Sequence, residues 1–396
     1  MSMISVDEAL ARLRDPVQVL VGSETVDLKS SAGCVLAVDV SAGLNVPPAD
    51  NSAMDGYALR REDWQGPDTG LAISQRITAG TPPQPLVIGT AARIFTGAEV
   101  PPGADVVVMQ EKCRTDDQSV WMKSVGPPGT NIRPKGQDIE CGATVLKAGH
   151  RLRAQDLGLI ASLGISMIDV MRPLKVAMIS TGEELVEPGE SVGPGQIYNS
   201  NRYTLGALLD GWGFDVMDFG IVADDPQALS DVMTQASQEA DVIITTGGVS
   251  VGEEDHVRPV VESLGLIDLW RIAIKPGKPF AYGEVLGTPF LGLPGNPVSV
   301  LVTTLFIARP FLFDCQGLRH HDIVPIRQIA LFDKQGGTRQ EYLRIRSGPD
   351  GAEIFPQQSS GVLYSTSWGD GLAIQKTGED IRSGELIDVI PYALFG

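Results

Sequence analysis

Three glycine-rich segments of this 396-residue chain have the composition of phosphate-binding loops. Each follows a short apolar run, and they span residues 180–184, 245–255 and 292–299. Glycine lets the backbone approach a ligand closely, and the first turn of a helix offers unpaired N–H groups to an anion. Ordinary turn chemistry explains any one loop, whereas three loops at one sheet edge favour phosphate binding. The candidate substrate contacts in these loops are Gly247, Gly248, Ser250, Asn296 and Ser299.

The third segment also carries a signal for the start of a helix. Asn296 is expected to cap a helix that begins at Pro297, which would leave its first N–H groups free for an anion. No segment matches the P-loop pattern Gly-x4-Gly-Lys-Ser/Thr, and no strand is followed by Gly-x-Gly-x-x-Gly. ATPase and dehydrogenase functions therefore lose their main support.

Three acidic residues follow strand-like runs and could bind a divalent cation. They are Glu184, Asp224 and Asp255. Mg²⁺ prefers a few carboxylates together with phosphate oxygens. Each residue could instead cap a helix or end a loop. The neighbouring Asp225 is better explained as the cap before Pro226.

Two lysines lie three residues apart in the segment Lys275-Pro-Gly-Lys278-Pro. In a turning backbone they could flank one oxyanion, although a solvated turn is the plain alternative. Arg344 and Arg346 are two residues apart and therefore share one face of a strand, where a surface ladder is the alternative. These cations stand out because the chain has 31 Lys and Arg against 49 Asp and Glu, a net charge of −18.

The overall composition excludes several classes of protein. A chain this acidic is a poor candidate for binding nucleic acid or an anionic membrane. The four cysteines include no Cys-x-x-Cys pair, so neither a structural zinc site nor a disulfide framework is expected. The start of the chain lacks a signal-peptide pattern, and residues 298–313 read as too short and too polar to span a bilayer. A cytoplasmic protein is the expectation.

The chain is predicted to be a multidomain α/β protein. Residues 5–14 read as a helix, and prolines break residues 45–141 into short strands of a β-rich insert. Residues 142–172 show an apolar helical pattern. Strands and helices alternate over 173–316, which predicts βαβ units and a mainly parallel sheet. From 317 onward, short alternating strands predict a small β-barrel or sandwich.

Six motifs in this order resemble those of the molybdopterin molybdenumtransferase (MoeA-type) family, which includes the C-terminal domain of gephyrin. The resemblance covers essentially the whole chain. Its most specific strings are Asp-Asn-Ser-Ala-Met-Asp-Gly-Tyr and Gly-Leu-Pro-Gly-Asn-Pro. The matching segments are residues 48–58, 96–98, 180–185, 246–252, 275–279 and 292–299.

The resemblance implies an elongated subunit of four domains in a head-to-tail homodimer. Domain I would combine residues 1–44 with 142–172 and help to form the dimer. Domain II would be the β-rich insert, 45–141. Domain III, 173–316, would be the α/β domain that binds molybdopterin, and domain IV, 317–396, the C-terminal β-barrel.

The family's reaction, as the resemblance implies it, joins molybdate to the dithiolene of adenylated molybdopterin. AMP is released and molybdenum cofactor forms, with Mg²⁺ assisting. The dithiolene sulfurs attack, so no protein nucleophile is required. The implied partners are adenylated molybdopterin and molybdate, together with a molybdopterin adenylyltransferase and maturation factors of molybdoenzymes.

The resemblance also assigns roles to individual residues. Acids on the Mg²⁺ and AMP side would be Glu184, Asp224 and Asp255. In domain II, Asp55 and Thr96 would face domain III of the partner subunit. Asp55, Glu184, Asp255, Lys275 and Lys278 are the expected catalytic residues. The molybdate side would consist of Lys275, Lys278, Ser299, Arg344 and Ser360, and Pro276 is a further expected substrate contact.

Two departures from the family pattern stand in the chain. Gly136-Gln137-Asp138 replaces Gly-Glu-Asp, which puts any role of that first acid in doubt. Gly369-Asp370-Gly371 replaces Ala-Asn-Gly, and Asp370 is expected to point away from an oxyanion pocket.

Other functions remain open at this level. An adenylyltransferase shares the α/β domain but lacks the Asp50–Tyr57 motif and domain IV. A non-enzymatic scaffold of the gephyrin kind is a third class, although nothing in the chain encodes the extra domain and linker of that role. Molybdate and tungstate are too alike in size and charge to be distinguished.

Overall fold

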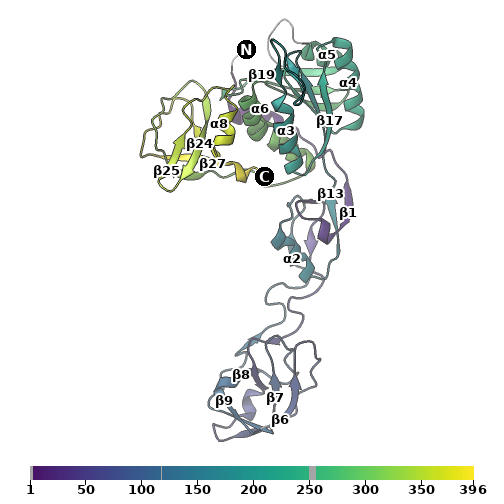
Figure 1. The fold of residues 1–396 in the computed structure, drawn as a ribbon. Helices are drawn as coiled ribbons and strands as arrows, with labels where there is room; N and C mark the ends of the chain where they lie inside the picture. Colours follow the sequence, from purple (N-terminus) through teal and green to yellow (C-terminus); the bar gives the residue numbers. More distant parts are fainter. Residues whose placement is uncertain (1–2, 117, 249–255) are drawn as a thin grey trace.

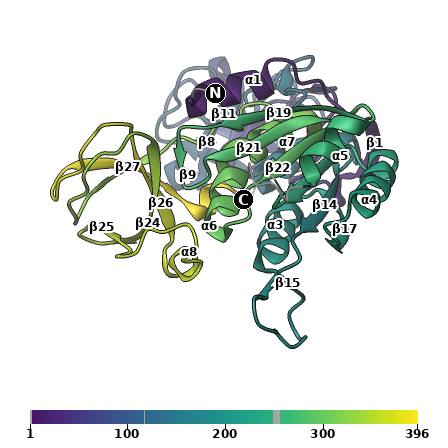
Figure 2. The same ribbon diagram turned by 90° about the horizontal axis from the view of Figure 1, so that it is seen from above.

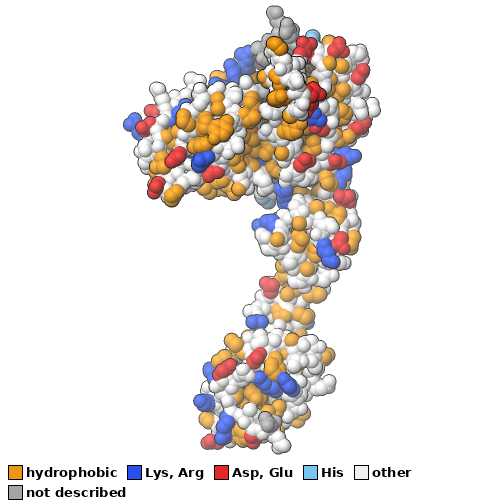
Figure 3. All heavy atoms as spheres, viewed as in Figure 1, with side chains coloured by type: hydrophobic (Ala, Val, Ile, Leu, Met, Phe, Trp, Pro, Cys, Tyr) orange, Lys and Arg blue, Asp and Glu red, His pale blue; other side chains and the backbone are white. Residues whose placement is uncertain are grey.

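The computed structural model describes residues 3–116, 118–248 and 256–396 and has an elongated shape. Figure 1 shows the α/β unit and the C-terminal β unit side by side at one end of the molecule. A small middle unit follows, and the β-rich insert lies at the opposite end. On the face shown in Figure 3, basic and acidic side chains are interspersed.

The N-terminal helix forms as predicted but packs in the α/β unit. α1 (Val6–Arg14) is capped by Ser5, whose hydroxyl accepts a hydrogen bond from the Glu8 N–H at 3.0 Å. Its buried residues Val6, Ala9 and Leu13 belong to the large core shared with α7 (Arg309–Gln316). The first helix is therefore part of the α/β core, whereas the strands that follow it in the N-terminal segment pair with strands of residues 142–172.

The middle unit is small, contains both strands and a helix, and has its own hydrophobic core. β1 (Ser23–Asp27), β13 (Met167–Met171) and β2 (Val35–Leu36) form an antiparallel sheet in the order β1-β13-β2. β3 (Val40–Ser41) pairs with β12 (Thr144–Leu146). The apolar helical pattern predicted for 142–172 holds only for α2 (Ala154–Ser162), because strands flank it on both sides.

The β-rich insert is confirmed as a sheet domain. Its six-stranded sheet has the order β8-β5-β7-β6-β10-β9, and apolar residues form a core on each face. A separate pair, β4 (Asn51–Ser52) and β11 (Ile132–Arg133), carries part of the Asp50–Tyr57 motif. The strands of the sheet are β5 (Gly56–Leu59), β6 (Gly70–Ile77), β7 (Thr90–Ile94), β8 (Val106–Met109), β9 (Cys113–Thr115) and β10 (Ser119–Met122).

The α/β unit is built on a six-stranded sheet in the order β17-β14-β18-β22-β21-β19. The first four strands are parallel, as predicted, and β21 pairs antiparallel with both β22 and β19. The strands are β14 (Lys175–Thr181), β17 (Asp215–Val222), β18 (Val242–Thr246), β19 (Gly265–Arg271), β21 (Pro279–Val285) and β22 (Thr288–Leu293).

Helices cover both faces of this sheet (Figure 2). α4 (Pro226–Glu239) and α5 (Val257–Leu264) pack on one face. α3 (Ser200–Gly211) and α6 (Pro297–Thr303) pack on the other. Along β14, residues alternate between the two cores, as the two-residue period of a strand requires. Asp225 caps α4 as predicted, accepting hydrogen bonds from the Gln227 and Ala228 N–H groups.

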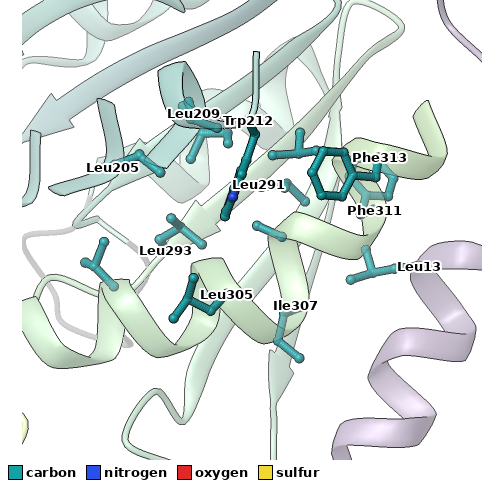
Figure 4. Close-up of a cluster of buried hydrophobic side chains, with 14 of the residues drawn as sticks. Leu13, Leu205, Leu209, Trp212, Leu291, Leu293, Leu305, Ile307, Phe311 and Phe313 are labelled. Carbon is teal, nitrogen blue, oxygen red and sulfur yellow. The ribbon is translucent and has the colours of Figure 1, made fainter. Parts of the chain in front are cut away.

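α6 continues without a break through a π-helical turn, η4 (Thr304–Ala308), into α7. Figure 4 shows its side chains packing among those of α3, β22 and α1. By length and composition, Pro297–Gln316 could cross a membrane, with a mean hydropathy of 1.6. This helix is longer than the stretch 298–313, which we expected to be too short and too polar to span a bilayer. However, 83% of its apolar window is buried inside the protein, as in the core helix of a globular domain.

The C-terminal unit is a small barrel that also pairs with the α/β unit. Its strand order is β20-β24-β26-β27-β23, and β25 pairs with β24. A bridge between Ala330 and Ala352 closes the circle around a separate core. β20 comes from the α/β unit, so this strand joins the two units. The strands are β20 (Ile274–Lys275), β23 (Ile326–Ile329), β24 (Gln340–Gly348), β25 (Gly351–Ile354), β26 (Gly371–Gln375) and β27 (Leu386–Pro391).

Candidate functional site

A cleft of about 810 Å³ lies at the carboxyl ends of β14, β18 and β22. Parallel strands end at the same edge of a sheet, so the three glycine-rich segments meet there, as expected. The barrel contributes Gly361 and Leu363 to the lining. The predicted residues that line the cleft are Glu184, Asp224, Gly247, Gly248, Asn296 and Ser299. Ser250 and Asp255 lie outside the described residues.

Gly247 and Gly248 cannot be replaced without strain. Their φ angles are +94° and +67°, in the region that side chains other than glycine rarely adopt. A Cβ at Gly247 would lie 2.7 Å from the Thr181 carbonyl oxygen, and one at Gly248 would lie 2.2 Å from Val257 Cγ2. Gly247 and Gly248 are thus pressed against β14 and α5, which presents their backbone to the cleft.

The start of α6 differs from the prediction in one respect. Asn296 occupies the cap position, but its side chain makes no capping hydrogen bond. The Val298 N–H donates to the carbonyl oxygen of Ser360 at 3.1 Å, so the barrel occupies part of this helix start. An anion in the cleft would therefore find fewer free N–H groups here than the sequence suggested.

Two of the three predicted metal ligands line the cleft. Asp224 is half-buried and Glu184 is exposed. A Cβ at Gly182 would lie 2.6 Å from Glu184 Oε2, so this carboxylate folds back over the glycine. Among the described residues, no group of three or more His, Cys, Asp or Glu could hold a metal ion. The oxygen donors present, with the unpartnered buried hydroxyl of Thr181, are of the kind that Mg²⁺ prefers.

A projecting loop borders the cleft and carries polar residues that the sequence reading did not single out. Its base is the pair β15 (Leu185–Val186) and β16 (Ile197–Tyr198), and Figure 2 shows the loop standing out from the unit. Asn199 caps α3, and the buried Asn201 side chain donates to the Gly295 carbonyl oxygen at 2.7 Å. The run Asn-Ser-Asn before a helical pattern was the available signal.

This loop is anchored by one arginine. Arg202 forms ion pairs with Glu187 at 2.7 Å and Asp218 at 2.6 Å. The hydrogen bonds that Arg202 donates to Asp218 and then to Glu187 raise the pKa of its guanidinium. The anchor ties the loop that follows Glu184 to α3 and β17, and so limits how far the cleft can open on this side.

The predicted oxyanion lysines lie at the seam between the α/β unit and the barrel. Lys275 Nζ is 3.0 Å from Glu341 Oε1 on β24, while Lys278 is exposed. Pro276 is buried, and a Cβ at Gly277 would lie 2.5 Å from Thr303 Cγ2, so this turn packs on α6. The lysines are not part of the cleft lining, although Pro279, which follows them, is.

Arg344 is completely buried and holds the barrel loop that reaches the cleft. Its Nε donates to the Ser365 hydroxyl at 3.1 Å and its Nη2 to the Ser359 carbonyl oxygen at 3.2 Å. Desolvation lowers the pKa of this guanidinium. Arg344 therefore holds the barrel loop that contains Ser359 and Ser365. In the same loop, the Ser360 carbonyl oxygen accepts the hydrogen bond from Val298 at the start of α6.

The neighbouring residues of the barrel point elsewhere. Arg346 is exposed and donates twice to the Trp368 carbonyl oxygen. The carboxylate of Asp370, which departs from the family pattern, accepts hydrogen bonds from the backbone N–H and the hydroxyl of Ser347. Asp370 is thus engaged on the barrel surface.

Asp55 and Thr96 form a compact pair in the β-rich insert. The Thr96 N–H and hydroxyl both donate to Asp55 Oδ1, each at 2.8 Å. These two hydrogen bonds, the backbone one first, lower the pKa of the Asp55 carboxyl. Figure 1 shows the insert at the opposite end of the molecule from the α/β unit, which forms the cleft, so the pair and the cleft do not meet within one subunit.

Comparison with known proteins gives a consistent picture. Three family models match: the MoeA N-terminal region, domains I and II (residues 4–164), a probable molybdopterin-binding domain (177–314), and the MoeA C-terminal region, domain IV (334–392). The chain is 41% identical to a molybdopterin molybdenumtransferase of Haemophilus influenzae, over 98% of this chain and 99% of that protein. It is 40% identical to one from Nostoc, over 93% and 83%.

A solved structure supports the same likeness over the full length. A MoeA molybdopterin biosynthesis protein from Pyrococcus horikoshii superposes with a TM-score of 0.86 at 27% identity. That comparison covers 99% of this chain and 100% of the other.

Proposed function

Because the chain belongs to the MoeA family of molybdopterin molybdenumtransferases, we infer that it is a transferase of molybdenum cofactor biosynthesis. We propose that it joins molybdate to the dithiolene of adenylated molybdopterin and releases AMP. The observation that carries this proposal is the convergence of three glycine-rich segments on one cleft that the barrel also lines.

The nucleotide half of the substrate would bind at the glycine loops. Close backbone approach at Gly247 and Gly248 suits a pyrophosphate, which accepts hydrogen bonds but tolerates little steric bulk nearby. Glu184 and Asp224 would hold Mg²⁺, with Asp255 as a further ligand by resemblance. When bound, the ion would neutralise charge on the bridging phosphates.

The oxyanion half would bind at the seam between the α/β unit and the barrel. Lys275, Lys278 and Ser299 would supply charge and hydrogen bonds to the tetrahedral dianion. Arg344 would act by shaping the loop that carries Ser360, because its guanidinium is buried and bonded to that loop. The net charge of −18 makes such local cations necessary for binding an anion.

We further propose a homodimer in which the insert of one subunit serves the cleft of the other. The support is the separation, within one chain, of the Asp55–Thr96 pair from the cleft. Co-expressing Asp55→Ala with Lys275→Ala chains tests this. Random pairing would leave about one quarter of the sites intact. Activity no higher than that of either variant alone would argue against sites shared between subunits.

The test of the main proposal is AMP release. Purified protein with adenylated molybdopterin, molybdate and Mg²⁺ should release AMP, and omission of molybdate is the control. Consumption of ATP with formation of pyrophosphate would instead favour an adenylyltransferase. We expect the reaction to take place in the cytoplasm, without nucleic acid or membrane as a partner.

A further inference from the structure

A buried carboxylate lies between two lysines at the seam. Glu341 on β24 has a side chain only 4% exposed. Lys275 Nζ lies 3.0 Å from its Oε1, and Lys334 Nζ lies 3.4 Å from its Oε2. Lys275 stands opposite Glu341 in the register of β20 and β24, and Gln375 stands opposite it on the other side. Lys334 precedes β24 and has no role in the function proposed above.

The two lysines are held very differently. The Lys334 backbone N–H and carbonyl both bond to Ile381, and the same carbonyl also accepts from the Gln375 side chain. The Lys334 side chain is 27% exposed, whereas that of Lys275 is 43% exposed and extends from a two-residue strand. Lys334 is therefore the fixed cation and Lys275 the one that can turn.

The contact between Lys275 and Glu341 is an ion pair without a directed hydrogen bond. Oε1 of Glu341 is buried and accepts no hydrogen bond, although the Lys275 ammonium is only 3.0 Å away. A buried carboxylate strongly resists losing its only cationic partner. Because Lys334 neutralises the other oxygen, Lys275 can leave without stranding that charge.

We propose that Glu341 and Lys334 are positioning residues that control Lys275 during oxyanion binding. In the empty site, Glu341 holds the Lys275 ammonium beside the turn 275–279. An incoming oxyanion draws Lys275 away, and Lys334 then carries the Glu341 charge alone. Neither residue touches the oxyanion. The inference rests on the proposed function, in which Lys275 binds molybdate.

The proposal predicts opposite changes in molybdate affinity for substitutions of Glu341 and of Lys334. Glu341→Gln removes the internal competitor, so molybdate should bind more tightly, by about threefold to tenfold. Lys334→Met leaves Glu341 with Lys275 alone, so molybdate should bind about tenfold more weakly. Lys334→Arg should restore binding. In a variant that combines Glu341→Gln with Lys334→Met, the second substitution should change molybdate binding little, because the carboxylate that Lys334 neutralises is gone.

The measurement is a calorimetric titration of the full-length protein with inorganic molybdate, independent of turnover. Lys376→Met, at an exposed lysine of the same barrel, is the matched control for the loss of one positive charge. Thermal unfolding of each variant shows that it is folded. If Glu341→Gln is not folded, the comparison of Lys334→Met with Lys334→Arg still tests the proposal, because only the first should weaken molybdate binding.

Two results would overturn the inference, and they differ from failure of the proposed function. Equal weakening by Glu341→Gln and Lys334→Met would show a structural ion pair that does not compete with the oxyanion. If Lys334→Met binds molybdate as tightly as the wild type does, Lys334 has no influence on oxyanion binding. If the wild type binds no molybdate, the oxyanion half of the proposed function fails together with this inference.

Discussion

The cleft and the seam are built by different means. The cleft depends on backbone conformation, because Gly247 and Gly248 in its lining let the backbone lie against β14 and α5. The seam is built from charged side chains of two units, paired across more than 60 positions of sequence, as in Lys275 and Glu341. A backbone site is present before any ligand arrives, whereas a site made of ion pairs must exchange one partner for another.

Exchanging single charges should separate the two regions most clearly. Lys275→Ala should lower kcat/KM for molybdate by about 100-fold or more while AMP binding is unchanged. Glu184→Gln should raise the Mg²⁺ concentration needed for half-maximal rate while molybdate binding is unchanged. Steady-state rates and separate AMP and molybdate titrations check both. If either variant lost binding of both AMP and molybdate, the cleft and the seam would act as one site.

Burial should make Arg344 far more important for stability than its neighbour on the strand. Arg344→Met leaves buried acceptors without a donor and should lower the free energy of unfolding by about 2–4 kcal/mol. Arg346→Met removes an exposed side chain and should cost about 0.5 kcal/mol or less. Urea unfolding of the two variants measures the difference. Similar values for both would contradict a structural role for Arg344.

A single methyl group should be enough to disturb the backbone cleft. Gly248→Ala forces a left-handed backbone and a clash with Val257, so we expect a loss of about 1–3 kcal/mol in stability and weaker AMP binding. Gly337→Ala is the control, since its Cβ would meet nothing within 4 Å and its φ is not in the left-handed region. Unaltered AMP affinity in Gly248→Ala would place the phosphates elsewhere.

The smallest expected effect concerns pH. The Asp55 pKa is lowered by the Thr96 N–H and hydroxyl, so the carboxylate stays charged as the pH falls through the ordinary range of Asp. Thr96→Ala removes the hydroxyl and should move the acid limb of the pH–rate profile upward by less than about one unit. Asp55→Asn should lack this titration. An acid limb that Thr96→Ala leaves unchanged would mean that Asp55 does not set it.

Local patterns predicted much of this protein. The Ser5 and Asp225 caps, the β-rich insert, the parallel strands and the polar strand ends all depend on residues a few positions apart. Because parallel strands must end at one edge, the meeting of the glycine loops followed from the order of elements. The likeness of the motifs to one family supplied the reaction.

Other features were decided only when the chain folded. The packing of α1 in the α/β core, the hydrogen bond from Val298 to Ser360, and the burial of Arg344 all join residues far apart in sequence. A lysine has the same letter in the sequence whether it faces water or a buried glutamate. Which of these it meets depends on how the α/β unit and the barrel pack together, and no short-range pattern encodes that contact.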